Sequence, residues 1–312
     1  ASRGFSTMSS WVFLRQTVPR CACRSAVLRQ RRSLARYSPP PQKKGAPRAG
    51  ASAHTTLPFA NELLMASGVV GAGVAFVLAV VVAWGASLDP CETHGCSCAC
   101  SCAERVSIFD GSAKEYESTV TRDEVFMLLP VMRWFLLRHA RGDVLEIAAG
   151  TGSNFAYYPK GCRVLATDAS EKMLQVAAAR KKHSKQKANV EVRKLDVSAL
   201  PLSVKFDTVV DSFGLCSFED PVDALERMGR ACKDDGRILL LEHGRSHYTW
   251  LNNILDANAQ RHLTKWGCSW NRDILKVIDD AGLHVDYLAR WHFGTTYYVV
   301  ARPSSVVVKG ER

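Results

Sequence analysis

The sequence predicts an α/β domain built around a doubly wound parallel sheet and preceded by one transmembrane helix. Three observations carry this prediction. An apolar run over residues 144–147, typical of a strand buried on both faces, ends in a turn with Gly150 and Gly152. Further apolar runs follow it, separated by segments of helix length, as in parallel strands joined by right-handed crossovers. An uncharged apolar stretch over residues 63–88 comes before all of them.

The N-terminal arm carries the whole excess of positive charge. Of the 41 Lys and Arg residues, eleven lie in residues 1–61, which contain no Asp or Glu, and the other thirty balance the thirty acidic residues. The folded domain therefore has no net basic charge of its own, and we expect no nucleic-acid partner. Residues 1–37 are Arg-rich and acid-free, as in a mitochondrial targeting presequence, with a disordered basic tail as the alternative. Residues 38–61 form a Pro-rich linker.

Residues 62–88 are predicted to form the transmembrane helix. The stretch from Leu63 to Leu88 has no charged residue, and at ~1.5 Å per residue it exceeds the ~30 Å hydrocarbon core of a bilayer. Small residues recur every four positions along it, so one face is smooth enough to pack against a membrane protein complex. The alternative is that the small residues have no packing role, because a valine-rich span simply tolerates glycine. If the basic arm stays in the matrix, the folded domain lies in the intermembrane space.

Residues 89–104 form a Cys-rich juxtamembrane linker. Five cysteines and His94 lie between Cys91 and Cys102. Such a run is compatible with a soft metal ion, with disulfides, or with acyl chains beside a membrane. Its alternating Cys-x-Cys spacing is not the paired C-x-x-C spacing of zinc modules, so we predict a low-complexity linker and no metal site. The other six cysteines are scattered, so the folded domain is not a disulfide scaffold.

The folded domain is expected over residues 105–302, followed by a short tail over 303–312. Asp168 ends the second apolar run eighteen residues after Gly150, about where a doubly wound sheet places the acid that binds ribose hydroxyls. A dinucleotide site needs a third glycine where Phe155 stands, which disfavours a dehydrogenase. A phosphate-binding loop would need Gly-Lys-Ser/Thr, which is absent from the turn. An adenosyl ligand without phosphates is therefore favoured.

Helices and the remaining strands complete the expected domain. Strands are predicted over residues 163–168, 190–195, 206–210 and 238–241, with a closing hairpin over 283–288 and 296–301 whose last strand is antiparallel. Helices are predicted over residues 116–139, with an interruption at Pro130, over 170–182 and 247–265 and from Asn271 to Ala281, and one more begins at Asp220. Ser170, Asp220 and Asn271 are the expected N-caps, because their side-chain oxygens can accept from free backbone N–H groups.

Five motifs together resemble those of the class I S-adenosylmethionine-dependent methyltransferases. They are Glu146-x-x-x-Gly150-Thr-Gly152, Asp168, Leu195-Asp196-Val197, Phe206-Asp-Thr-Val-Val-Asp211 and Gly236-Arg-Ile-Leu-Leu-Leu-Glu242. The resemblance implies a seven-stranded, Rossmann-like domain that uses S-adenosyl-L-methionine to methylate an acceptor. Narrower similarities, in residues 212–221, 240–246 and 266–273, are to the oxidase mutant suppressor proteins. Thiol methyltransferase-like proteins are a more distant match. The narrower resemblance implies a single-pass protein of the mitochondrial inner membrane.

The resemblance also implies a set of cofactor-binding residues. The glycine turn would border the methionine moiety, Asp168 would bind the ribose, and Asp196 would lie at the adenine. The complete predicted set is Glu146, Ala148, Gly150, Gly152, Asn154, Asp168, Ala169, Met173, Asp196, Val197, Ser212 and Phe213. Ala148 departs from the family pattern, which often has glycine there, and alanine restricts φ at that position.

The predicted catalytic residues are His243, Glu242 and His247. Methyl transfer requires a nucleophile aligned with the methyl group and, where needed, a base. His243 is the first candidate because histidine titrates near neutrality, and a structural histidine is the alternative. His262 ranks lower. Cys216 is interpreted as a small packed residue, since direct displacement needs no enzyme-bound intermediate.

The acceptor is expected to be small and apolar, such as a quinol or thiol, or else a protein. Apolar residues line one side of the helix predicted over 247–265, and Trp266, Trp270 and Trp291 follow it, so this segment is expected to roof an acceptor pocket. The alternative is that these tryptophans belong to the hydrophobic core and that the helix binds a partner protein. The rival function is a catalytically silent scaffold or assembly subunit of an inner-membrane respiratory complex, because a fold does not by itself establish an activity.

Overall fold

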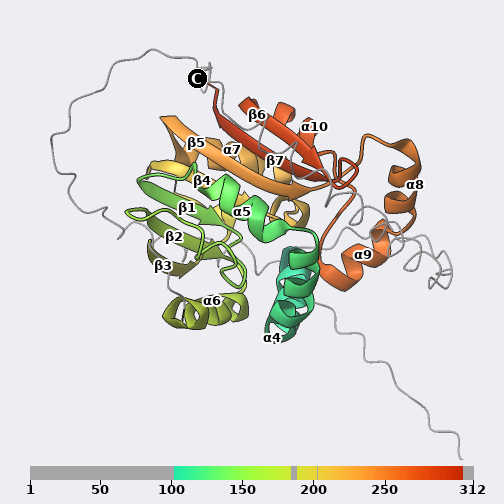
Figure 1. The fold of residues 1–312 in the computed structure, drawn as a ribbon, viewed down its shortest axis with the longest axis horizontal. Coiled ribbons are helices and arrows are strands. Elements are labelled where there is room, and N and C mark those ends of the chain that lie inside the picture. Colours follow the sequence, from blue (N-terminus) through green and yellow to red (C-terminus); the bar gives the residue numbers. More distant parts are fainter. Residues whose placement is uncertain (1–101, 184–187, 202, 305–312) are drawn as a thin grey trace, which may run out of the picture.

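The computed structural model describes residues 102–183, 188–201 and 203–304 (Figure 1). The predicted presequence, linker and transmembrane helix lie outside the described residues, as do nearly all of the juxtamembrane linker and most of the tail. Among the helices of the described ranges, none is both long enough and apolar enough for a membrane crossing.

A seven-stranded sheet organises the domain in the order β3-β2-β1-β4-β5-β7-β6, which confirms the predicted α/β class (Figure 1). Its strands are β1 (Asp143–Ile147), β2 (Arg163–Asp168), β3 (Asn189–Lys194), β4 (Phe206–Ser212), β5 (Cys232–His243), β6 (Leu283–Trp291) and β7 (Thr296–Pro303). The first five run parallel, and β7 runs antiparallel to both β5 and β6. The strand order reverses between β1 and β4, so a ligand is expected at the carboxyl ends of these two strands.

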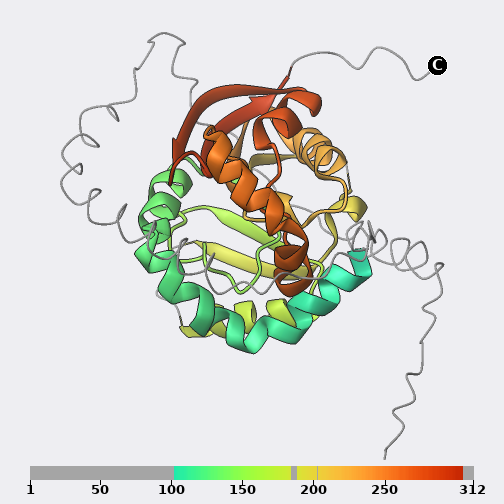
Figure 2. The same cartoon turned by 90° about the vertical axis from the view of Figure 1, so that its right-hand side faces the viewer.

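Helices cover both faces of the sheet and one of its ends. They are α4 (Cys102–Phe126), α5 (Leu129–Leu137), α6 (Glu171–His183), α7 (Pro221–Ala231), α8 (Thr249–Ala257), α9 (Ala259–Trp266) and α10 (Ile274–Asp280), with short 3-10 turns η1 (Val197–Ala199) and η2 (Leu215–Ser217). Figures 1 and 2 show α4, α8 and α9 together at one end of the sheet, the end to which β5 delivers His243.

Alternation along the strands divides the hydrophobic core between the two faces. In β1, Leu145 and Ile147 pack on the face that includes Met228 of α7 and Ile274 of α10. Val144 points to the other face, where Leu136 of α5 is buried. Because both faces are covered, all five residues of β1 are buried, including the charged Asp143 and Glu146.

Two of the three predicted helix caps are confirmed. The Ser170 Oγ accepts from the Met173 backbone N–H at 3.1 Å, and the Asp220 carboxylate accepts from the N–H groups of Val222 and Asp223. The third cap was wrong. Asp273 caps α10 by accepting from the Lys276 N–H, while the Asn271 amide donates to Asp256 at 2.8 Å.

Two predicted helices are each divided in the structure. The helix expected over residues 116–139 is α4 followed by α5, with Leu128 between them in a left-handed conformation at φ 54° and a proline in the first turn of α5. The helix expected over 247–265 is α8 followed by α9, separated at Asn258, whose ψ of 3° departs from helical values. The fifth strand begins at Cys232, six residues before the predicted start.

Candidate functional site

The turn after β1 is sharply bent and leaves space beside its glycines. Ala148, Gly150 and Gly152 all have left-handed backbones, at φ 48°, 54° and 77°. A Cβ built on Gly152 would lie 2.5 Å from the ring of Phe155, so only glycine lets this ring pack under the turn. A Cβ built on Gly150 would meet nothing within 4 Å. The Gly150 side of the turn therefore borders open space in which a ligand can approach the backbone.

Glu146 lies just before the turn and is almost completely buried. Its two carboxylate oxygens accept from the Asn154 amide and from the Tyr158 hydroxyl, each at 2.9 Å. Burial raises the pKa of Glu146 to about 7, although these two hydrogen bonds and the charge of Arg133 oppose the rise. The group consequently gains and loses its proton near neutrality.

Arg133 connects this carboxylate to the helices at the end of the sheet. Its guanidinium donates to the Asn154 Oδ1 at 2.8 Å and forms an ion pair with Glu124 at 2.6 Å. It also lies over the Phe213 ring, with 5.3 Å between the guanidinium carbon and the ring centroid. The sequence analysis missed both Arg133 and Tyr158. A single charged residue in the otherwise apolar segment of α5 was the available signal for Arg133.

Asp168 closes the turn from β2. One of its carboxylate oxygens accepts from the Gly150 N–H and the other from the Ser170 N–H, both at 2.8 Å. Burial raises the pKa of Asp168 despite these hydrogen bonds. Each oxygen keeps a further lone pair, so the carboxylate can accept from a ligand hydroxyl as well. The ribose-binding role of Asp168 stays a prediction.

The other predicted cofactor residues lie along the same strand ends. Asp196 caps η1 by accepting from the Ser198 N–H at 2.8 Å, and Val197 is the first residue of that turn. Ser212, at the end of β4, accepts from the Asn154 amide at 3.1 Å, and Phe213 follows it with φ 61°. Ala169 follows Asp168, and Met173 is buried in α6.

Glu242 belongs to a pair of buried carboxyl groups with Asp211. Each is the next-to-last residue of its strand, β5 and β4 respectively, and both residues are 0% exposed. Burial, followed by the charge of Asp211, raises the pKa of Glu242 well above its usual range. Burial is also the main cause of the raised pKa of Asp211. The Glu242 Oε1 accepts from the Gly214 N–H at 3.3 Å. A carboxyl group held in its protonated form is a poor general base, which weighs against the catalytic role predicted for Glu242.

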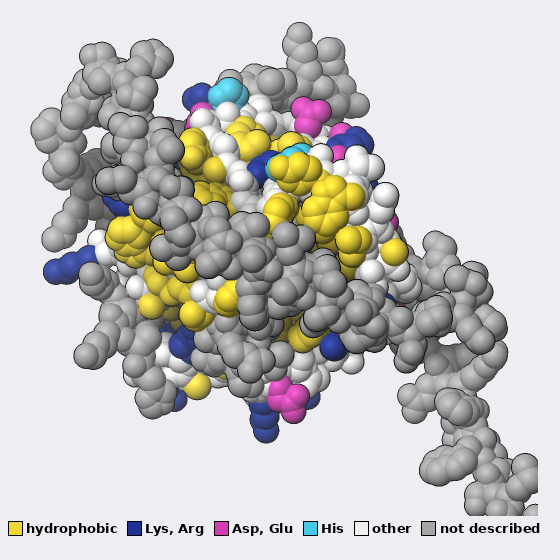
Figure 3. All heavy atoms as spheres, turned by 45° about the vertical axis from the view of Figure 1, so that its right-hand side comes forward, with side chains coloured by type: hydrophobic (Ala, Val, Ile, Leu, Met, Phe, Trp, Pro, Cys, Tyr) yellow, Lys and Arg dark blue, Asp and Glu magenta, His cyan; other side chains and the backbone are white. Residues whose placement is uncertain are grey.

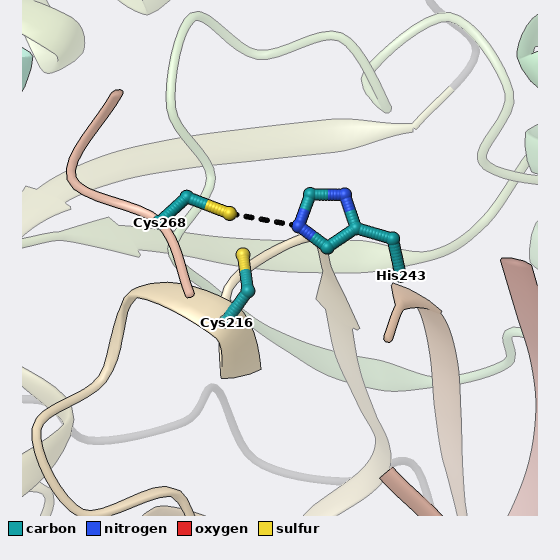
Figure 4. A group of neighbouring side chains, drawn as sticks. All are labelled: Cys216, His243 and Cys268. Atoms are coloured by element: carbon teal, nitrogen blue, oxygen red, sulfur yellow. Dashed lines mark hydrogen bonds between the residues drawn. The ribbon is translucent and has the colours of Figure 1, made fainter. Parts of the chain in front are cut away.

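His243 is brought together with two cysteines that are far from it in sequence (Figure 4). Its Nε2 lies 2.8 Å from the Cys268 Sγ, and Cys216 lies beside both. A hydrogen bond with the Cys268 thiol is the largest cause of the lowered pKa of Cys216. Burial alone lowers the pKa of His243, but the neighbouring charge of Cys216 outweighs it and the pKa is raised. His247 is exposed, and its ring packs against Tyr248 with 4.1 Å between centroids.

A mostly apolar cavity of about 270 Å³ lies next to these strand ends. It is lined by Met127, Leu129, Phe213, His243, Gly244, Trp250, Leu251, Leu255, Trp270, His292, Phe293, Thr295 and Thr296. Trp250, Leu251, Leu255 and Trp270 come from the segment that was predicted to roof an acceptor pocket. Trp266 and Trp291 of that prediction are not part of the lining.

The cavity reaches a hydrophobic part of the surface. Trp250 lines it and is 45% exposed, so the cavity meets solvent at this side chain. Phe126 and Leu128, next in sequence to the lining residues Met127 and Leu129, are 45% and 52% exposed. Figure 3 shows hydrophobic side chains gathered on this side of the molecule. An apolar molecule would therefore meet apolar side chains on its way in.

The sheet order, the glycine turn and the acid that ends β2 define the class I S-adenosylmethionine-dependent methyltransferases. Comparison with known proteins agrees. The family model described as a methyltransferase domain matches residues 145–240. The yeast (Saccharomyces cerevisiae) protein "Methyltransferase OMS1, mitochondrial" is 37% identical over 224 residues, which cover 66% of this chain and 48% of the yeast protein. The chain therefore spans about half the length of that relative.

Two other relatives extend the comparison. The demethylmenaquinone methyltransferase of Renibacterium salmoninarum is 34% identical over 174 residues, covering 51% of this chain and 70% of the bacterial protein. The human thiol S-methyltransferase TMT1B is 32% identical over 154 residues, covering 46% of this chain and 62% of the human protein. The chain belongs to the class I methyltransferases, in the group that includes OMS1, and S-adenosylmethionine is its cofactor.

The residues at the strand ends fit this cofactor. Open space borders Gly150, and the buried carboxylate of Glu146 provides a negative charge near the turn. Asp168 lies at the end of the neighbouring strand with acceptor capacity to spare. A ribose hydroxyl could donate to Asp168, and a cationic amino group could pair with Glu146.

Proposed function

We propose that this chain transfers a methyl group from S-adenosylmethionine to a small, mostly apolar acceptor that binds in the 270 Å³ cavity. S-adenosylmethionine supplies an electrophilic methyl group on a sulfonium ion. The observation that carries the proposal is that Phe213 and His243 belong both to the strand ends and to the cavity wall. A cavity that shares its wall with the cofactor site brings an acceptor next to the reacting methyl group.

The protein's own contribution would be to position the acceptor and to exclude water. Aromatic rings of Phe213, Trp250 and Trp270 make the cavity suitable for a flat or apolar molecule. His243 is a polar side chain at its inner wall, and we propose that it helps to position the nucleophilic atom of the acceptor. Glu242 is buried behind the strand end and His247 is exposed outside the lining, so neither is part of the proposed reaction.

Two acceptor classes are compatible with the cavity, a quinol-like ring and a thiol. The names of the bacterial and human relatives, a demethylmenaquinone methyltransferase and a thiol S-methyltransferase, support both classes. A protein acceptor would have to insert a side chain into the cavity.

We further propose that the protein resides in mitochondria and is anchored in the inner membrane by residues 62–88. The name of the yeast relative supports the organelle, and the apolar sequence supports the anchor. The exposed hydrophobic side chains beside the cavity would then face a source of apolar acceptors. Import into isolated mitochondria followed by alkaline carbonate extraction tests the anchor, and release of the imported protein into the supernatant would contradict it.

Filling the cavity tests the proposed acceptor site. Leu255→Trp places a larger side chain in the wall, and we expect it to abolish methyl transfer to quinol and thiol acceptors while S-adenosylmethionine still binds. Leu275→Trp is the matched control, because Leu275 lies on α10 outside the lining and is 36% exposed. Transfer of radiolabelled methyl groups and calorimetric cofactor binding would be measured on both variants. Equal transfer rates in the two folded variants would place the acceptor elsewhere.

A further inference from the structure

We propose that Cys216, His243 and Cys268 bind a Zn²⁺ ion beside the acceptor cavity (Figure 4). Their ligand atoms, two Sγ atoms and one imidazole nitrogen, all lie within 4.8 Å of one another. The three residues come from η2, from the end of β5 and from the loop after α9. The tertiary fold brings the three residues together, and no local sequence pattern predicts the cluster.

The distances fit a tetrahedral zinc ion after small side-chain movements. Zn–S bonds of about 2.3 Å and Zn–N bonds of about 2.0 Å place tetrahedral ligand atoms roughly 3.5–3.8 Å apart. The His243 Nε2 and the Cys268 Sγ, now 2.8 Å apart, would separate by less than about 1 Å to admit the ion. Rotation about the Cα–Cβ bond of a cysteine moves its sulfur by more than this.

Backbone contacts already hold the two cysteines together. The N–H of Ser269, which follows Cys268, donates to the Cys216 carbonyl at 2.9 Å. Gly267 ends α9 in a left-handed conformation at φ 68°, which turns the chain toward Cys216. The Cys268 carbonyl lies 3.0 Å from the Nδ1 of His262. The cluster is therefore preorganised by contacts that do not use the three ligand atoms.

Further packing fixes His262 behind the loop. Its ring stacks on Trp270 with 4.0 Å between centroids, and the Trp270 indole N–H donates to the Leu255 carbonyl at 2.9 Å. Both Trp270 and Leu255 line the cavity. The residues that hold the Cys268 loop in place therefore also form part of the cavity wall. A rigid support of this kind is what a metal site needs to keep its ligands in place.

Charge and burial also favour zinc. Cys216 and Cys268 are 1% and 6% exposed, so two bare thiolates would be costly at this position. Zn²⁺ with two thiolates and a neutral imidazole has no net charge, which removes most of that cost. Sulfur and nitrogen donors in a tetrahedral arrangement select zinc over the hard cations Mg²⁺ and Ca²⁺.

Three protein ligands leave a fourth coordination position for an exogenous group. His243 is both a ligand and part of the cavity wall, so an acceptor in the cavity lies beside the ion. A thiol acceptor would bind zinc through sulfur as a thiolate and release its proton to water. Its sulfur would then form a bond to the methyl carbon while the carbon bond to the sulfonium sulfur breaks. The products are S-adenosylhomocysteine and a neutral methyl thioether, which binds zinc weakly and leaves. This role rests on the proposed methyltransferase function, whereas the metal site itself does not.

Metal content tests the site directly. The full chain is purified with reducing agent, equilibrated with ZnCl₂, desalted and measured by plasma mass spectrometry. Five cysteines near the N-terminus are replaced by serine in every sample so that they add no zinc: Cys91, Cys96, Cys98, Cys100 and Cys102. We expect about one Zn²⁺ per chain, and a loss of nearly all of it in Cys268→Ser and His243→Asn. Cys232→Ser is the matched control, because Cys232 is equally buried but outside the cluster, and it should retain zinc.

Cobalt substitution and cofactor binding complete the test. Co²⁺ bound by thiolates should give a sulfur-to-metal charge-transfer band that Cys268→Ser removes, which identifies cysteine as a ligand. Absence of zinc from the folded control protein, or equal zinc in all variants, would overturn the proposal. A Cys216–Cys268 disulfide in the reduced preparation, detected by alkylation and mass spectrometry, would overturn it as well. S-adenosylmethionine binding is measured on the same samples. A protein that binds the cofactor but no zinc would refute the metal site and leave the proposed methyltransferase function standing.

Discussion

Replacing Glu146 by glutamine should change how both folding stability and cofactor affinity depend on pH. Glu146 is 1% exposed, and burial raises its pKa from the usual 4.5 to about 7. Between these two values the folded protein binds more protons at this site than the unfolded chain does. The free energy of unfolding therefore falls as pH rises through that window. The pKa difference corresponds to about 3 kcal/mol, fully present below pH ~4.5 and lost by pH ~7.

Cofactor binding should lower the pKa of Glu146, whereas burial raises it. We propose that the ammonium group of S-adenosylmethionine lies near Glu146, where it would stabilise the carboxylate and lower its pKa in the complex. Affinity for S-adenosylmethionine should then rise with pH by up to about tenfold per pH unit below pH ~7 and level off above it. Glu146→Gln keeps an acceptor for the Asn154 amide but cannot ionise, so its affinity should be weaker and nearly independent of pH.

Urea unfolding and titration calorimetry at about pH 5.5 and about pH 8 measure the two effects. Other buried carboxyls, among them Asp211 and Glu242, titrate in both proteins, so the difference between the parent and Glu146→Gln isolates Glu146. The same pH dependence in both proteins would refute the reasoning. It would mean that Glu146 is ionised throughout the range, or that the ammonium group lies elsewhere.

Three further substitutions probe the supports of the site. Arg133→Met leaves Glu124 without its partner and should cost about 3 kcal/mol in urea unfolding, and a loss below about 1 kcal/mol would contradict the bridging role. Asp220→Ala removes the cap of α7 and should cost about 1 kcal/mol, whereas Asp220→Asn should cost almost nothing; equal losses would argue against capping. Ala148→Gly relieves a left-handed alanine and should leave thermal stability unchanged or higher, so a marked drop in Tm would show that Ala148 is not strained.

The strands and the cofactor turn could be predicted because short-range chemistry determines them. Val144, Leu145 and Ile147 place apolar side chains on both faces of β1, which specifies a covered parallel strand. Asp220 and Pro221 form a cap that needs no tertiary contact, and the structure confirms it. Even the departure at Ala148 was visible in sequence, and the structure gives this residue the positive φ that glycine would favour.

The misplaced helix boundaries came from competing local signals and from tertiary contacts. Asn271 and Asp273 are both good capping residues two positions apart, and the chain uses Asp273, while Asn271 pairs with Asp256 on α8. The break at Asn258 has no proline or glycine to mark it.

The side-chain clusters depended on distances that no sequence window contains. Arg133 reaches Asn154, 21 positions further along the chain, and Cys216 meets Cys268 across 52 positions. Cys216 was interpreted as a packed residue because direct methyl displacement needs no enzyme-bound intermediate, and no neighbouring residue in the sequence marked it as a ligand. The grouping of Cys216 and Cys268 around His243 required the fold.

We propose that the turn at Gly150 and the carboxylate of Asp168 form a working cofactor site. Calorimetric titration of the chain with S-adenosylmethionine, beside Gly150→Arg and Asp168→Ala, tests it most directly. The parent should bind, Gly150→Arg should fill the space beside the turn, and Asp168→Ala should lose the ribose acceptor, so that neither variant binds measurably. A folded parent that does not bind would contradict the enzymatic account and favour a catalytically silent scaffold.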